Sequence, residues 1–62
     1  MLMNVPEYAS EYRWLIVTRV GAEHWFYGAY ADESRADAIA YDLRHNHGQD
    51  VSVMENPGYQ GA

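Results

Sequence analysis

The hydrophobic pattern of this chain changes period once, and that change limits the folds it can adopt. Residues 13–20 and 24–31 are rich in β-branched and aromatic side chains, and a glycine-containing turn at 21–23 separates them. The two segments predict a β-hairpin whose first strand is apolar on both faces in its middle. From Asp32 onward the apolar residues recur at helical spacing, and a second alternating segment, 50–55, follows. The order strand, strand, helix, strand is therefore expected.

The predicted helix begins after Asp32, a good N-cap residue, and ends before Gly48, which suits the C′ position. Side chains three or four positions apart form one apolar stripe along it: Ala36, Ile39, Ala40, Leu43 and His47. Because two members of the stripe are alanine, the helix axis can lie close to a sheet.

This order of elements admits few topologies. A right-handed crossover makes 24–31 and 50–55 parallel, with 13–20 between them and antiparallel to both. The predicted fold class is α+β: a three-stranded antiparallel sheet of order 2-1-3 with one helix packed on one face. The set expected under the helix is Leu15, Val17, Phe26, Gly28, Tyr30, Val51 and Val53. The set expected on the opposite face is Trp14, Ile16, Trp25, Tyr27, Ala29 and Met54. The two sets could also be exchanged, since a shift of one residue turns every side chain over.

Sixty-two residues fit a single domain, for which we expect a folded core over 13–56, an N-terminal arm over 1–12 and a flexible tail over 57–62. One helix covers only one face of the sheet. Two alternatives exist for the other face: an interface with another molecule, or the arm folded back through Val5, Tyr8 and Tyr12. Because a chain this short buries a small core, self-association through a sheet face or an edge strand is also expected, and a homodimer is one form of it.

The net charge of the chain indicates which kinds of molecule it can bind. Nine acidic residues against four basic ones give a net charge of −5, and all four bases are arginine. This balance opposes direct binding of nucleic acid and favours a protein partner with a basic surface. The acidic residues expected to contact it are Glu33, Asp37, Glu23 and Asp42. Of these, Glu33 and Asp37 share one flank of the predicted helix with Tyr41, about 6 Å apart along its axis.

Three aromatic residues, Trp14, Trp25 and Tyr27, are expected to anchor the partner from the sheet face that the helix leaves uncovered. Aromatic sheet faces also stack bases in RNA-recognition domains. The alternative functions are therefore a sheet-face binder of single-stranded nucleic acid or glycan, or a small structural homo-oligomeric phage protein.

Catalysis, cofactors and metal sites find no support in the sequence. There is no cysteine, and no Gly-rich loop opens the helix. His45 and His47 are about 200° apart on a helix, so they cannot share a metal ion. No apolar run approaches the roughly 20 residues of a membrane span, and the first residues lack the pattern of a signal peptide. We expect a non-enzymatic protein of the cytoplasm, which is the host cytoplasm if a phage encodes it.

Two resemblances bear on function. The motif Tyr27-Gly28-Ala29-Tyr30, followed by Asp32, Ser34-Arg35-Ala36, Leu43-Arg44 and Gly48, resembles the strand–helix segment of SPOR domains, which bind peptidoglycan glycans. The second half of the SPOR fold has no counterpart here, so no binding residues are transferred. In size, acidity, lack of cysteine and single ββαβ unit, the chain is similar to phage-encoded anti-CRISPR proteins. That resemblance implies an inhibitor, in part a mimic of DNA, that blocks the nucleic-acid-binding surface of a Cas effector complex.

Overall fold

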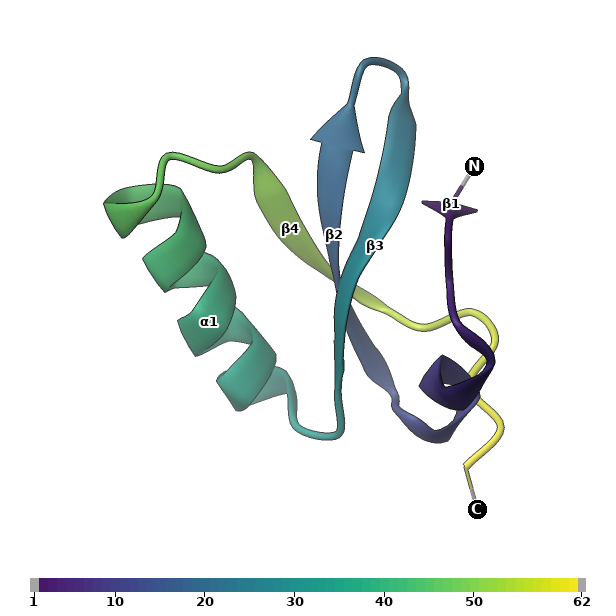
Figure 1. Ribbon diagram of the computed structural model, residues 1–62. Helices are drawn as coiled ribbons and strands as arrows, with labels where there is room; N and C mark the ends of the chain where they lie inside the picture. The colour runs from purple at the N-terminus through teal and green to yellow at the C-terminus, as the bar shows by residue number, and fades with distance from the viewer. Residues whose placement is uncertain (1, 62) are drawn as a thin grey trace.

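The computed structural model describes residues 2–61. Its elements in chain order are β1 (Leu2–Met3), the 3₁₀ helix η1 (Glu7–Glu11), β2 (Trp14–Val20), β3 (Glu23–Tyr30), α1 (Glu33–Asn46) and β4 (Val51–Glu55) (Figure 1). They form an α+β fold with a four-stranded mixed sheet of order β1-β3-β2-β4.

The three long strands adopt the predicted order, with β2 in the middle and antiparallel to both β3 and β4. The prediction of a three-stranded, wholly antiparallel sheet is wrong in one respect. β1 joins the outer edge of β3 in a parallel pairing, with Leu2 opposite His24 and Met3 opposite Trp25. A strand of two residues is too short to show an alternating pattern, so the sequence predicts only an N-terminal arm there.

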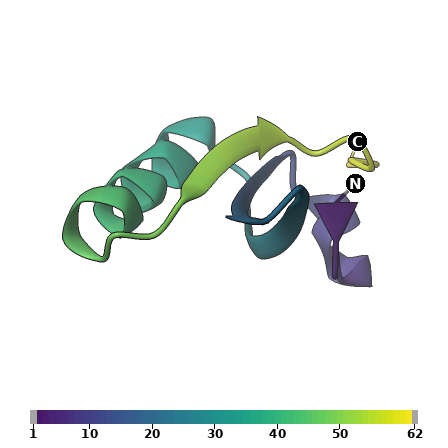
Figure 2. The same ribbon diagram turned by 90° about the horizontal axis from the view of Figure 1, so that it is seen from above.

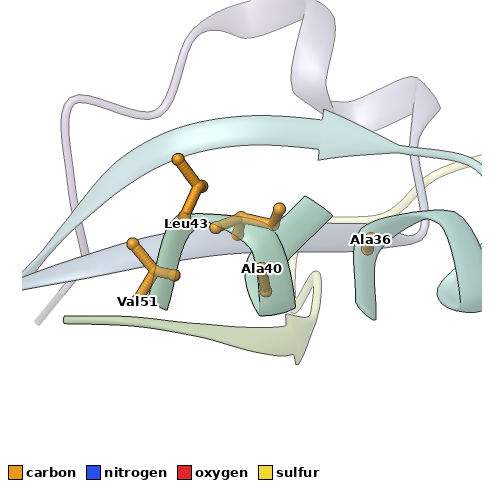
Figure 3. Close-up of a cluster of buried hydrophobic side chains, with 5 residues drawn as sticks. Ala36, Ala40, Leu43 and Val51 are labelled. Carbon is orange, nitrogen blue, oxygen red and sulfur yellow. The ribbon is translucent and has the colours of Figure 1, made fainter. Parts of the chain in front are cut away.

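Helix α1 begins and ends where its capping residues predict. The Asp32 carboxylate accepts a hydrogen bond from the Ser34 backbone N–H, and Gly48 has a φ of +65° directly after the C-cap residue His47. The buried side of α1 comprises Ala36, Ala40 and Leu43, which pack toward β4 and β2 (Figure 3). His47, expected on the buried stripe, is exposed, because the helix ends at Asn46.

The register of the sheet corrects the expected faces of β2. Ile16 lies opposite Val53, so Ile16 shares the face of Val51 and Val53 beneath α1. Trp14 packs on this face too, whereas Leu15 and Val17 point to the other one. The faces predicted for Val51, Val53 and Met54 are confirmed, and the wrong assignments on β2 follow from a registration error of one residue.

A β-bulge at Tyr27 corrects the expected faces of Phe26 and Trp25, whereas the faces predicted for Tyr30 and Ala29 are confirmed. Ile16 pairs with Gly28 but its neighbour Val17 pairs with Phe26, so Tyr27 has no partner on β2. Because one residue is inserted, side chains before the bulge are turned over relative to those after it. Phe26 therefore packs on the face away from α1, and Trp25 lies opposite Thr18 on the α1 side.

The face of the sheet away from α1 is covered by the N-terminal segment. Ala9 of η1 is fully buried against Leu15 and Val17, and the half-buried Leu2, Phe26, Ala29 and Met54 complete this second core. The Tyr8 ring meets Phe26 edge-on at 6.4 Å. In Figure 2 the layers separate clearly, with α1 on one side of the hairpin and the N-terminal segment on the other.

Asn56 joins the N-terminal segment to the end of β4. Its buried side-chain amide donates to the backbone carbonyls of Ala9 (2.9 Å) and Tyr12 (3.0 Å), and its Oδ1 accepts from the Gly58 N–H. The region expected to be a flexible tail contacts the same segment, because the Gln60 N–H donates to the Ser10 carbonyl at 2.9 Å. One side chain thus satisfies backbone groups from both ends of the chain.

Replacing Asn56 with alanine should lower the free energy of unfolding by about 2 kcal/mol or more, because two carbonyls lose their donor in a buried setting. Urea denaturation followed by circular dichroism measures this. The matched control is Asn46→Ala, at an exposed position near the end of α1, which should change stability by less than about 0.5 kcal/mol. Equal effects of the two changes would contradict the assigned role of Asn56.

The close approach of α1 to the sheet predicts a second stability difference. Ala40→Leu should cost about 1–3 kcal/mol, because Ala40 is fully buried between helix and sheet and leaves no room for a larger side chain. Ala38→Leu, on the exposed side of the same helix, should cost less than about 0.5 kcal/mol. Thermal unfolding of both variants tests this, and a stable Ala40→Leu protein would show that the interface is not tightly packed.

Candidate protein-binding site on helix α1

The flank of α1 that carries Glu33 and Asp37 is the strongest candidate for a binding site. Both side chains are exposed, and neither forms a hydrogen bond or ion pair with another residue in the part of the chain that the structure describes. They are one turn apart, so their separation along the axis is about 6 Å. Glu33 lies in the first turn, where a negative charge is favoured by the helix dipole.

Tyr41 continues this line of residues at the next turn and ends it in an aromatic pair. Its side chain is 59% exposed, and its ring stacks on the imidazole of His45 at a centroid distance of 4.0 Å. The stack was not predicted, although the spacing of four positions on a helix is a signal that could have found it. The residues Glu33, Asp37 and Tyr41 together are called the acidic ridge below.

Arg44 fixes the position of this flank relative to the sheet. Its guanidinium Nη1 donates a 2.9 Å hydrogen bond to the backbone carbonyl of Val51, at the start of β4. Arg44 follows Asp37 by seven positions, about two turns, so it lies on nearly the same side of the helix. The flank bearing the two free carboxylates is therefore the one next to β4.

The other two predicted acidic residues lie elsewhere. Asp42 is on the opposite flank of α1, where its carboxylate accepts a hydrogen bond from the Asn46 amide and lies 3.4 Å from Nε2 of His47. Glu23 begins β3 at the hairpin end, and the strand separates it from the start of α1 by roughly 23 Å (Figure 1). The structure thus brings two of the four together.

The three predicted aromatic anchors do not form one exposed face. Trp14 is half-buried in the core beneath α1, with the Arg13 guanidinium 5.9 Å from its ring centroid. Trp25 lies between Thr18 and Met3 in the sheet, and its indole N–H is buried without a hydrogen-bond partner within residues 2–61. Tyr27, at the bulge, is 44% exposed. These three rings therefore do not lie together on the sheet face where they were expected.

The sheet face expected to be open as an interface is closed over much of its area by η1. What remains is a shallow pocket of about 310 Å³ lined by Leu2, Val17, His24, Ser52 and Met54. Of the two alternatives for this face, the structure shows the arm folded back. Ala9, the residue buried most completely there, gives no signal in the sequence because alanine occurs equally in exposed helices.

Within the described residues 2–61, no group of three or more His, Cys, Asp or Glu side chains could hold a metal ion. A second pocket of about 390 Å³ lies between η1 and the chain end, with a mixed lining that includes Pro6, Glu7 and Gln60. No helix in the described range is long and apolar enough to cross a membrane.

Comparisons with known proteins do not assign the chain to a family. The sequence matches no protein-family model, and no curated protein or solved structure shows significant similarity to it.

Removing the Arg44 side chain should loosen the flank from the sheet. Arg44→Ala is expected to lower the free energy of unfolding by about 1–2 kcal/mol, because a charge-assisted, partly buried hydrogen bond is lost. Arg35→Ala, at an exposed position in the first turns of the same helix, should have no such cost, since a positive charge there opposes the dipole. Chemical denaturation of both variants distinguishes them, and equal stability would refute the role of Arg44.

Proposed function

We propose that the protein is a small acidic inhibitor of the anti-CRISPR type, which blocks the nucleic-acid-binding surface of a Cas effector complex by placing the acidic ridge of α1 against it. The observation that carries this proposal is the pair Glu33 and Asp37, exposed, one turn apart and without a partner in the described part of the chain. Their separation of about 6 Å along the helix is comparable with the direct distance between neighbouring phosphate groups of a nucleic-acid strand.

The charges of the rest of the chain support the same role. Arg13 is paired with Glu55 at 2.9 Å, Arg44 donates to the Val51 carbonyl, and Arg19 donates to the Gly21 carbonyl. Three of the four arginines are thus engaged within the protein. The net charge of −5 then speeds encounter with a positively charged channel. The exposed ring of Tyr41 adjoins the carboxylates and supplies apolar contact area, which slows dissociation once the ridge is docked.

Reversing both charges on the ridge tests the proposal. Glu33→Lys with Asp37→Lys should weaken inhibition of DNA binding by a purified Cas effector–guide complex by at least about 100-fold, because lysines would face the arginines and lysines of the complex. An electrophoretic mobility-shift assay with target DNA, run at low and high salt, measures the effect. The double variant should remain folded, with a stability loss of about 1 kcal/mol from the first-turn lysine.

The matched control reverses Glu7 and Glu11, the two exposed acidic residues of η1, and carries the same net charge as the ridge variant. It should inhibit within about threefold of the parent protein, since η1 lies on the other side of the sheet from α1. If the folded ridge variant inhibits as well as the parent at low salt, the acidic flank is only a solvated surface and the proposed function is wrong.

A further inference from the structure

The outer edge of β4 is an edge of the sheet at which β4 has no neighbouring strand among the described residues. β4 is last in the strand order, and no described segment pairs with its far edge. Two backbone hydrogen bonds show which of its groups face β2: the Arg19 N–H donates to Asp50 O (3.0 Å), and the Asn56 N–H donates to Arg13 O (2.7 Å). Because backbone groups alternate along a strand, the even-numbered residues of 50–56 bond to β2.

The odd-numbered residues Val51, Val53 and Glu55 therefore direct their backbone N–H and C=O groups outward. The Val51 carbonyl accepts from Arg44, and as a carbonyl it retains a second lone pair. This hydrogen bond also shows that the Arg44 flank of α1 lies next to the edge. An exposed edge of this kind is a template for an added strand.

The spacing of alternate side chains on a strand paired with this edge matches the spacing of the two carboxylates on the acidic ridge. Alternate residues of an extended chain are about 6.8 Å apart, and Glu33 and Asp37 are about 6 Å apart along α1. A strand added to β4 would turn every second side chain toward the helix face of the sheet. Two basic side chains separated by one residue could then reach Glu33 and Asp37 while their backbone pairs with Val53 and Glu55.

We propose that the outer edge of β4 binds an extended basic segment of the partner protein as an added antiparallel strand, with alternate basic side chains directed at Glu33 and Asp37. The inference rests on the proposed function, because it names the element of the partner that meets the acidic ridge. α1 and β4 run in opposite directions, so an antiparallel segment runs along α1 in the same direction as the helix (Figure 1). A second copy of this chain is disfavoured as occupant, because it brings a further net charge of −5 to an acidic surface.

A synthetic peptide that alternates arginine and valine is the direct probe. In hydrogen-exchange NMR, the amides of Val53 and Glu55 should become at least about tenfold more protected when it is added. A peptide of the same composition with its arginines in one block should bind at least about tenfold more weakly. A third peptide, N-methylated at the amides that would pair with β4, keeps its charge and should also bind at least about tenfold more weakly.

A pair of variants tests the edge from the protein side. Glu55→Pro removes an outward N–H and leaves the bonds between β4 and β2 intact, whereas Glu55→Ala loses the same ion pair with Arg13 but keeps the N–H. The proline variant should bind the alternating peptide at least about tenfold more weakly than the alanine variant. If the proline variant fails to fold, the N-methylated peptide still decides the question.

The outcomes separate this inference from the proposed function. Edge pairing is wrong if the peptide with its arginines in one block, or the N-methylated peptide, binds as well as the alternating peptide. It is also wrong if the amides of Val53 and Glu55 stay unprotected while the alternating peptide binds. Both conclusions hold even where charge reversal of the ridge abolishes inhibition. If the two amides are already protected in a dimer seen by sedimentation, the occupant is a second copy and the inference is overturned. Protection by the peptide upholds edge pairing, even if charge reversal of the ridge leaves inhibition of the Cas complex unchanged.

Discussion

The burial of β2 on both faces is the constraint on which the rest of the structure depends. Leu15, Ile16 and Val17 are consecutive and all at most 2% exposed, so alternate side chains point into two separate cores. One helix can serve only one of them. The N-terminal segment supplies the second cover with a five-residue 3₁₀ helix centred on the fully buried Ala9. The protein thus has two small hydrophobic cores on opposite faces of the sheet, one covered by α1 and the other by η1.

Much of this arrangement can be predicted from the sequence, and the failures have definite physical causes. The change of hydrophobic period, the Asp32 cap and Gly48 locate the helix, and the connectivity rules order the three long strands. The face assignment fails because it depends on register, and a pairing error of one residue exchanges the sets. The bulge at Tyr27 adds an inversion confined to one strand, for which an alternating pattern of aromatic residues gives no sign.

In the candidate site, too, the features set by neighbouring residues can be predicted, whereas those set by contacts far apart in the sequence cannot. Glu33, Asp37 and Tyr41 can be grouped from helical spacing, because that geometry is local. Trp14 and Trp25 were expected to be anchors on the assumption that one sheet face is open, and that assumption depends on where the arm lies. The contact of Arg44 with Val51, which places the ridge beside the sheet edge, joins two elements across a loop. No property of either residue alone indicates it.

The amide of Asn56 also sets the order in which the molecule can assemble. Its bond to the Ala9 carbonyl spans 47 positions of sequence, and the second core needs β2, β3 and β4 together before η1 has a surface to dock on. During synthesis the hairpin and helix can form from local contacts, but the N-terminal segment must wait until residue 56 has been added. Residues 7–12 are thus synthesised before the strands that they pack on, yet they are among the last to reach their native position. Contacts this distant in sequence slow folding relative to a helical protein of equal length.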